Sequence, residues 1–570
     1  MTNTDINMAE TDIDEPRKRI GVIADTAGCG LRCGLRPTPG QQRILAALER
    51  AFPVRFEPVD SAAPGNVDGL LALDPSALPQ PGRTGVPRLV LHSGAARRTA
   101  GTHTDDTDAP PTGEELGPVM LADVSGLARP LRGRAISEST LAGELPPPPA
   151  GAAVLASVQG RPVWWQLGEG ASELAVSAYP LAELAEGKAL RDYMRAGCFM
   201  RLLPLVHFIG RLLGADGWRP PPLRASFVVD DPNLHWPSYG FLKYRELVTH
   251  ARAHGYHLGL ATVPIDGWLA DRRVTELLAQ NACVLSLLVH GNDHIARELG
   301  RLRTDTEAQS VIAQALRRID ALERRSGVKV NRVMLPPHGA CSEAALRAMF
   351  RLGVEAVSVN PLYPWRDDLP ASTPLAGWHP AELVAGGLPV LPRHHLRDPR
   401  EELALRAMLG QPLILYGHHG DFEQGLDILA QATGDINALG DVQWGPLGWI
   451  ARGNYTTRRL GPTLLVRMHA RRIAVDVPAG VRTLRVLCQE PLGGAAAHRL
   501  SHAGGSVDIA FADGAGASQP LAVDAPTPIE LTLLADRPLL AADVPSRGIR
   551  PWPWIRRTLV EGRDRLQPLR

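Results

Sequence analysis

The sequence is poor in cysteine and in net charge, and each shortage narrows the class of protein. Six cysteines are scattered over 570 residues, which is typical of reduced thiols and not of a disulfide framework. The 61 basic and 60 acidic side chains give a formal net charge of +1, so no overall field would attract nucleic acid or an anionic membrane. We expect a cytoplasmic protein that does not bind nucleic acid.

Long hydrophobic runs and nucleotide-binding loops are also missing. The residues before Arg19 are polar and acidic, unlike a secretory signal. The most apolar stretch, 200–213, contains charged residues and is shorter than a bilayer span, so we interpret it as a buried amphipathic helix and expect no transmembrane segment. The glycine-rich turn at 28–30 lacks both the third glycine of a dinucleotide fingerprint and the Lys-Ser/Thr of a phosphate loop. We interpret this turn, with its Cys29/Cys33 pair, as structural.

A chain of 570 residues is too long for one core and predicts several domains. Strands expected at 19–24, 54–59, 69–73 and 88–92 alternate with a helix that starts at a Thr38 capping box, which favours an N-terminal α/β domain. Short alternating segments after residue 461 favour a C-terminal β-sandwich. The expected segments are a flexible start (1–18), an α/β domain with Pro-rich linkers and a hairpin at 153–167 (19–221), a barrel (222–460), the β-sandwich (461–545) and a basic, Trp-containing tail (546–570).

Four apolar runs of the barrel segment each end in reactive residues. The runs and the residues that follow them are 225–229 with Asp230 and Asp231, 284–289 with His290 and His294, 329–335 with Pro337, His338 and Gly339, and 412–416 with His418 and His419. In an αβ barrel the carboxyl ends of the strands form one rim, and active sites lie there. We therefore expect these residues in one site.

An Asp-His-His set at this rim predicts an open metal site. His290 and His294 are four residues apart, so on one helical turn they would share a face and bind one ion together with Asp231. Asp230 and Asp231 are adjacent at the end of a strand, so their side chains point in opposite directions. Asp230 therefore faces a different part of the pocket. Taken singly, these residues are equally typical of turn carboxylates and packed histidines, but their order along the chain favours a metal site.

This ordered set resembles the polysaccharide deacetylase family, also called the NodB-homology or carbohydrate esterase 4 group, over residues 222–425. The resemblance implies a distorted (β/α)7 barrel, a divalent metal that is usually zinc, and hydrolysis of an acetamido or acetyl ester group on a sugar. It also implies a role for each matching residue. These are Asp230 as general base, Asp231, His290 and His294 as metal ligands, and His418 or His419 as general acid. A backbone N–H near Pro337, His338 and Gly339 could stabilise the oxyanion.

The chain departs from the family pattern at three places. Leu335 or Pro336 stands where the family has an arginine that orients the base, and Arg332 lies too early on the strand to replace it. The family's Asp-Trp pair has no counterpart in 360–368, and Gly291 stands where Ser or Thr is commoner. We interpret the charged run at 393–395 as a solvated loop, although it could line the pocket.

Three functions remain open: a carbohydrate deacetylase, a metal-dependent amidohydrolase that acts on a non-sugar amide, and a non-catalytic sugar-binding relative. The missing arginine favours the last two, whereas the complete metal triad and the paired carboxylates favour catalysis. A cytoplasmic location favours an acetylated glycan precursor, such as a lipid- or nucleotide-linked sugar, as the substrate. The flanking domains would then position this substrate or bind a partner enzyme.

Overall fold

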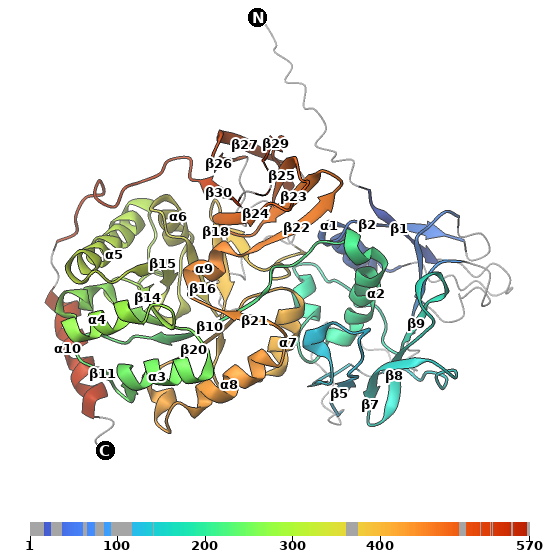
Figure 1. Ribbon diagram of the computed structural model, residues 1–570, viewed down its shortest axis with the longest axis horizontal. Coiled ribbons are helices and arrows are strands. Elements are labelled where there is room, and N and C mark those ends of the chain that lie inside the picture. Colours follow the sequence, from blue (N-terminus) through green and yellow to red (C-terminus); the bar gives the residue numbers. More distant parts are fainter. Residues whose placement is uncertain are drawn as a thin grey trace, which may run out of the picture. The chain divides into compact units, whose positions relative to one another are not determined.

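The chain folds as two compact units in the computed structural model drawn in Figure 1. The first unit holds the chain up to Trp218 with the short segments Ala371–Trp378 and Glu401–Met408, and the second holds the remainder from Arg219. The structure describes residues 16–23, 37–60, 65–73, 85–92, 117–140, 142–360, 374–489, 497–512, 515–524, 526, 528–548 and 551–566. The turn at 28–30, Cys33 and nearly all of 360–368 therefore lie outside the described residues.

In the described part of the first unit, nine strands form one sheet in the order β2-β1-β3-β4-β9-β8-β7-β5-β6. Neighbours from β2 to β9 in this order are parallel, and neighbours from β9 to β6 are antiparallel. The expected parallel arrangement therefore covers one half of the sheet, and the expected hairpin is formed by β7 and β8. The strands are β1 (Lys18–Ile23), β2 (Val54–Val59), β3 (Gly69–Ala72), β4 (Arg88–Leu91), β5 (Val119–Leu121), β6 (Ala135–Ile136), β7 (Ala153–Val158), β8 (Arg161–Leu167) and β9 (Leu174–Ser177).

Local sequence signals account for two helices of this unit. α1 (Pro39–Ala51) begins at Thr38, whose hydroxyl accepts from the Gln41 N–H at 3.1 Å, and the Gln41 side chain accepts from the Thr38 N–H at 3.1 Å. The expected capping box is therefore present. α2 (Leu203–Leu213) buries most of its side chains, as expected for the apolar stretch at 200–213. No helix within the described ranges is long and apolar enough to cross a bilayer.

The second unit is built on a sheet that curls into a nearly closed barrel. Its described strands follow the order β17-β18-β16-β15-β14-β13-β10-β20-β19, with β21 beside β10. All neighbours are parallel except β17 and β18. The strands are β10 (Leu223–Asp230), β13 (Leu258–Thr262), β14 (Leu285–His290), β15 (Val330–Leu335), β16 (Ala356–Val359), β17 (Glu382–Val384), β18 (Leu388–Pro392), β19 (His394–His395), β20 (Leu413–Gly417) and β21 (Val442–Trp444).

Helices cover the outside of this sheet, as Figure 1 shows. They are α3 (Tyr244–His254), α4 (Arg272–Gln280), α5 (Asp305–Ser326), α6 (Glu343–Arg351) and α8 (Asp427–Asn437). α5 starts where its sequence predicts, since the Thr304 hydroxyl accepts from the Glu307 N–H at 3.2 Å. It ends at Gly327, whose φ of 71° is a left-handed conformation that glycine adopts at little cost.

The extended stretch that contains β18 and β19 brings the two ends of the sheet together. β18 pairs with β16, and β19, which begins just after Arg393, pairs with β20. Because β20 also pairs with β10, hydrogen bonds run almost all the way around the sheet. The carboxyl ends of its strands therefore meet at one rim.

Apolar side chains fill the inside of this sheet. Fully buried members of this core are Val228, Leu288, Val333, Leu391 and Ile414, from β10, β14, β15, β18 and β20. Side chains two residues apart lie on the same face of a strand. The next inward positions toward the rim are therefore Asp230, His290, Leu335, Arg393 and Tyr416. This alternation places the candidate site directly above the apolar core.

The C-terminal part consists of short strands and one helix. The strands expected at 464–469, 472–477, 483–488, 506–511 and 529–534 are confirmed, with small shifts at their ends. They are β23 (Thr463–Met468), β24 (Arg472–Asp476), β25 (Thr483–Gln489), β27 (Gly505–Ala512) and β30 (Pro528–Leu534). The structure adds β22 (Tyr455–Leu460), β26 (Ala497–His502), β28 (Ala515–Ala517) and β29 (Leu521–Ala522). β27 pairs with both β26 and β28, which joins the strands into one network, so the two-sheet sandwich stays a prediction. The basic tail forms helix α10 (Pro551–Leu566).

Candidate metal centre

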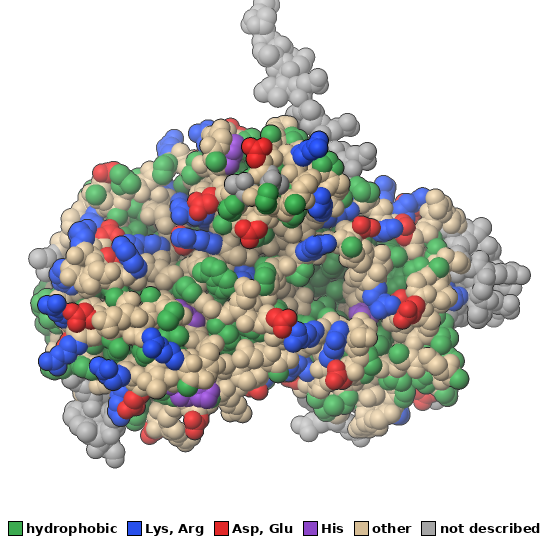
Figure 2. Space-filling model, in the orientation of Figure 1, with side chains coloured by type: hydrophobic (Ala, Val, Ile, Leu, Met, Phe, Trp, Pro, Cys, Tyr) green, Lys and Arg blue, Asp and Glu red, His purple; other side chains and the backbone are tan. Residues whose placement is uncertain are grey.

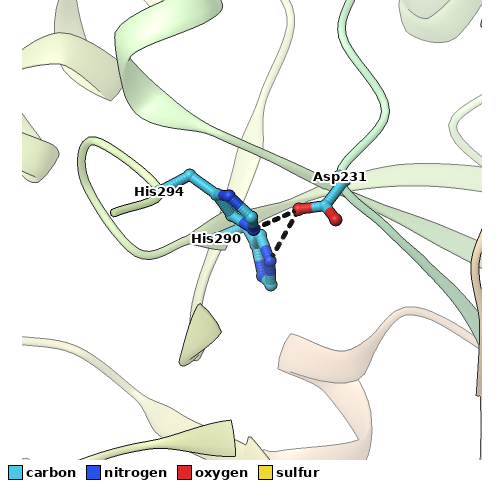
Figure 3. Close-up of side chains that lie close together, drawn as sticks. All are labelled: Asp231, His290 and His294. Carbon is cyan, nitrogen blue, oxygen red and sulfur yellow. Dashed lines mark ion pairs between the residues drawn. The ribbon is translucent and has the colours of Figure 1, made fainter. Parts of the chain in front are cut away.

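Asp231, His290 and His294 bring three ligand atoms to one point, as Figure 3 shows. The Nε2 atom of His290 lies 3.0 Å from Asp231 Oδ1, and the Nε2 atom of His294 lies 2.6 Å from the same oxygen. One carboxylate and two imidazoles form a donor set that suits zinc and related divalent ions, and they leave coordination positions for water and substrate. The three residues predicted as ligands therefore fit a divalent ion.

Backbone strain is concentrated at this centre. Asp231, His294 and His338 have φ values of 69°, 54° and 57°. The left-handed region costs a residue with a Cβ about 1–2 kcal/mol. Within the described ranges only six non-glycine residues have a positive φ, and these three are half of them. Such conformations persist only where the surrounding structure holds them, and they cluster at functional sites.

The segment between the two histidines is a loop and not the expected helical turn. His290 ends β14, and both Gly291 (φ 62°) and His294 adopt left-handed conformations, which an α-helix excludes. The Glu298 carboxylate accepts hydrogen bonds from the three N–H groups of residues 292–294 at 2.6 to 3.2 Å. The imidazoles therefore converge because Glu298 closes the loop, and not because they share a helical face.

Gly291 has a structural reason in this loop. A Cβ at this position would lie 2.2 Å from Glu298 Oε1 and 2.5 Å from the ring of Pro337. The Ser or Thr that is commoner in the resembled family would therefore displace the carboxylate that closes the loop. Arg318 fastens the same loop from α5, because its Nη1 donates to Asn292 Oδ1 at 2.7 Å.

Asp230, the predicted base, is paired with an arginine. Arg393 Nη1 lies 2.8 Å from Asp230 Oδ1, and both side chains are only 4% exposed. The Arg393 guanidinium also lies over the Tyr416 ring, 4.1 Å from its centroid. Burial alone raises the pKa of Asp230, but the charges of Arg393 and His290 outweigh it, so the net pKa is lowered. The carboxylate is therefore ionised and held in place.

Our interpretation of 393–395 as a solvated loop is wrong for Arg393. Leu335 takes the inward position at the end of β15, and Arg332 points to α5, where it pairs with Asp320 at 2.7 Å. The guanidinium that meets Asp230 comes instead from the strand that closes the sheet. The sequence does contain a signal for this position of Arg393. Arg393 lies two residues after the apolar Leu391, and side chains two residues apart on a strand point to the same, here inward, face.

The two histidines after β20 have different surroundings. His418 belongs to a second cluster with His395 and Asp421, in which the possible ligand atoms all lie within 4.8 Å of one another. Asp421 Oδ2 accepts from the His418 backbone N–H at 2.9 Å and lies 3.3 Å from His395 Nε2. His418 is also among the charges that lower the pKa of Asp230, which places it near the predicted base.

His419 packs against the hairpin formed by β11 (Ser238–Tyr239) and β12 (Leu242–Lys243). Its ring lies 5.1 Å from that of Tyr239 and 6.0 Å from that of Phe241. A Cβ at Gly240 would lie 2.3 Å from His419 Nδ1, so the hairpin encloses this ring closely. His418 and not His419 therefore lies among the charged groups near Asp230.

Of the three residues predicted to supply an oxyanion N–H, His338 is the one that remains. Pro337 carries no N–H, and the Gly339 N–H already donates to the Pro336 carbonyl at 2.9 Å. The His338 ring lies 5.7 Å from that of His294. This residue therefore lies at the metal centre and has a backbone conformation that the centre holds under strain.

Helix α10 contacts the same centre. The guanidinium of Arg557 donates to the Asp231 carbonyl oxygen at 3.4 Å and pairs with Asp266, with Nε 3.0 Å from Oδ2. Arg556 donates to the His294 carbonyl oxygen. Adjacent arginines of one helix thus hold the backbones of two strained ligands. Sequence analysis identified a basic, Trp-containing tail here but not its contact with the site.

The shared carboxylate sets the protonation of the two imidazoles. Burial lowers the pKa of both rings. At His290 the negative charge of Asp231 outweighs burial and the net pKa is raised, whereas at His294 burial prevails and the net pKa is lowered. A histidine must be neutral to bind a metal. Protons therefore compete with the metal chiefly at His290.

Solved structures described as polysaccharide deacetylases and family 4 carbohydrate esterases are among those that match part of this chain. A protein described as a polysaccharide deacetylase from Mycobacterium smegmatis matches at 16% identity and a TM-score of 0.31, over 42% of this chain and 94% of its own. A family 4 carbohydrate esterase from Streptomyces lividans, in complex with acetate, matches at 10% identity and a TM-score of 0.24, over 40% and 92%. A family 4 pseudoenzyme from Bacillus anthracis matches at 11% identity and a TM-score of 0.24, over 40% and 68%. No protein-family model and no curated protein sequence matches the chain.

Proposed function

We propose that the protein is a metal-dependent hydrolase that removes an N- or O-linked acetyl group from a carbohydrate. The observation that carries this proposal is the convergence of Asp231, His290 and His294 on one point at the rim that also holds the ionised Asp230. A divalent ion held there, most simply zinc, would polarise the acyl oxygen and lower the pKa of water. The proposal includes the distorted (β/α)7 barrel that the family resemblance implies.

Asp230 is the general base in this mechanism. It takes a proton from the water that attacks the acyl carbon, and for this it must be ionised and oriented. Its lowered pKa keeps the carboxylate ionised, and the hydrogen bond from Arg393 fixes its direction. Arg393 thus orients the base, which is the role that the family resemblance implies for the arginine that is missing near position 335.

His418 is the general acid in this mechanism. It gives a proton to the leaving nitrogen or oxygen after the tetrahedral intermediate forms. Asp421 lies beside it, and its Oδ2 accepts from the His418 backbone N–H at 2.9 Å. The His338 N–H is the proposed backbone donor to the oxyanion.

An acetate-release assay tests this function. Purified protein is incubated with Zn²⁺ and a panel of N- and O-acetylated sugars, together with acetylated non-sugar amides. We expect acetate from at least one sugar, its loss on chelation and its return with Zn²⁺. Release from non-sugar amides alone would identify a metal-dependent amidohydrolase, and sugar binding without any release would identify a non-catalytic relative. Either result would replace this proposal.

The proposed substrate is an acetylated glycan precursor inside the cell, in line with the cytoplasmic location that the sequence predicts. The flanking segments would position this precursor or bind a partner enzyme. Fractionation of cells that produce the full chain tests the location, and recovery from the medium or periplasm without cytoplasmic markers would contradict it.

A further inference from the structure

Exposed apolar side chains gather around α10. Nine large hydrophobic side chains within the described ranges are exposed, and six of them belong to three segments near this helix. These six, the apolar patch, are Trp236, Trp268, Leu269, Trp552, Ile555 and Leu559, with exposed fractions from 47% to 67%. Large exposed apolar patches mark interaction sites on folded proteins.

Direct contacts join the three segments into one surface. The ring of Trp268, in the short helix η7 (Pro264–Leu269), meets that of Trp554 edge-on with centroids 4.8 Å apart. His235, the neighbour of Trp236, pairs through Nδ1 with Glu561 of α10 at 2.8 Å. The patch is therefore one surface built from the loop after β10, from η7 and from α10.

α10 has one packed face and one exposed apolar face. Pro553 and Arg557 are buried, whereas Trp552, Ile555 and Leu559 recur at helical spacing and are at least 51% exposed. A helix in a globular protein normally turns such a stripe toward a core. A helix that combines an exposed apolar stripe, tryptophan and arginine is typical of segments that lie in the interface of a bilayer.

The border of the patch is positively charged, although the whole chain is nearly neutral. The exposed Arg325 donates to the carbonyl oxygens of Gly267 and Trp268, which places it beside the patch. Arg273 on α4 and Arg324 on α5 are exposed as well. Three nearby carboxylates are paired: Asp266 with Arg557, Glu276 with Arg272 and Glu561 with His235. Asp271 instead caps the start of α4, where its side chain accepts from the Arg273 N–H. Figure 2 shows Lys and Arg side chains over the part of the second unit that holds α4, α5 and α10. This local charge complements anionic lipid headgroups.

A pocket of about 390 Å³ opens within the patch. Trp268 and Trp554 line it together with Arg318 and Arg325. The Arg318 guanidinium is paired with Asp293, and that of Arg325 donates to the Gly267 and Trp268 carbonyl oxygens. Indole rings favour the headgroup level of a bilayer. The pocket is therefore a mostly apolar, indole-lined hollow that suits the apolar part of an amphiphile.

We propose that the apolar patch docks on an anionic lipid bilayer, and that the acetylated sugar is presented there on a lipid carrier. The second part rests on the proposed function, whereas the docking does not. Arg556 and Arg557 lie on the helix that carries the patch and hold the backbones of His294 and Asp231, so the metal centre lies close to the docked surface. A second copy of the chain fits less well, because two copies face to face would bring their arginine borders together.

Vesicle co-sedimentation tests the docking. The full chain is mixed with vesicles of phosphatidylcholine and phosphatidylglycerol, or of phosphatidylcholine alone. We expect binding to the anionic vesicles that weakens as salt is added. The double variant Ile555→Ser/Leu559→Ser should bind about tenfold more weakly, because two apolar side chains no longer enter the interface. Leu540→Ser, at a side chain that is 69% exposed and outside the patch, should bind like the wild type.

Other outcomes would overturn the docking. These are no binding of the wild type to anionic vesicles, equal binding to both vesicle types, and equal binding by a folded double variant. A dimer in light scattering that the double variant abolishes, without vesicle binding, would identify a self-interface instead. If the double variant fails to fold by circular dichroism, Trp552→Ala repeats the test at one position. His290→Ala should still bind vesicles but release no acetate, so acetate release by this variant with intact docking would count against the deacetylase proposal alone.

Discussion

Two clusters of one aspartate and two histidines lie at the rim of the same sheet, and they differ in the charges around the carboxylate. Among the ion pairs of the described chain, those of Asp231 join its Oδ1 to histidine ring nitrogens alone. Asp421, in contrast, also pairs with Arg397 at 2.8 Å. The ligands around Asp231 are mostly buried and two have strained backbones, whereas His418 is exposed. The same residue types are thus suited to a metal in one cluster and to proton transfer in the other, and burial and neighbouring charge decide which.

The largest expected effect separates the two clusters by metal content. His290→Ala or His294→Ala should remove the ion, since either change leaves two of three protein ligands. His395→Ala should keep it. Metal analysis after dialysis measures this, and a retained ion in both of the first variants would contradict the assignment.

The wild type should also lose metal as the pH falls, because the raised pKa of His290 lets protons compete for that ring.

A second large effect separates the base from the metal ligands. Asp230→Asn should keep the metal but lower turnover at least about 100-fold, because an amide cannot accept the proton of water. Arg393→Met should raise the pKa of Asp230 and so move the acidic limb of the rate profile to higher pH, and Arg393→Lys should restore part of the loss. Near wild-type turnover in Asp230→Asn would point to another base, with Asp421 the next candidate.

A smaller effect tests how far the first cluster depends on α10. Arg557→Ala should weaken metal binding about tenfold, as is typical when a group that supports the ligands is lost. Competition with a chromophoric chelator measures the affinity, and the absorption spectrum of the Co²⁺-loaded protein reports on ligand geometry. Arg563→Ala, at an exposed position on the same helix, is the control. An unchanged metal affinity and spectrum in Arg557→Ala would show that the helix does not support the centre. If the helix does support it, any fragment that ends before α10 should also bind the metal more weakly.

The smallest effect concerns the stability of the second cluster. Burial raises the pKa of Asp421, but the His418 N–H, Arg397 and His395 outweigh it and the net pKa lies below the ordinary 3.8. A lowered pKa stabilises the fold above the unfolded-state value, and this contribution disappears as the pH falls through the folded value. Asp421→Asn should therefore be less stable than the wild type by under about 1 kcal/mol at pH 7, because Arg397 is largely exposed. Urea unfolding at several pH values should show the two proteins converge in acid, and a constant difference would contradict this.

The strands and the order of the site residues could be predicted because they depend on local patterns. A buried parallel strand is an almost continuous apolar run, so the ends of β10, β14 and β20 marked Asp231, His290 and His418 directly. The capping residues Thr38 and Thr304 identified helix starts for the same reason. None of these predictions required knowledge of which strands are neighbours.

The remaining features depend on contacts between distant parts of the chain. Arg393 meets Asp230 only because β19 pairs with β20, and Arg557 meets the Asp231 carbonyl across 326 positions of sequence. The spacing of His290 and His294 also fits a helical turn. The Glu298 carboxylate holds this segment as a loop instead, and a single glutamate gives no periodic signal in the sequence. Such pairings become visible once the strand order is known.

The close fit of Gly291 and Glu298 constrains the order in which this site can change over evolution. Serine at position 291 would collide with the Glu298 carboxylate, so an ancestor with serine there must have closed its loop by other means. A mutational route from such an ancestor passes through glycine before glutamate, since the reverse order creates the collision first. Deep mutational libraries that vary positions 291, 298 and 337 together should accordingly show sign epistasis, with serine at 291 tolerated only where 298 and 337 both carry smaller side chains, because Pro337 also lies against this position.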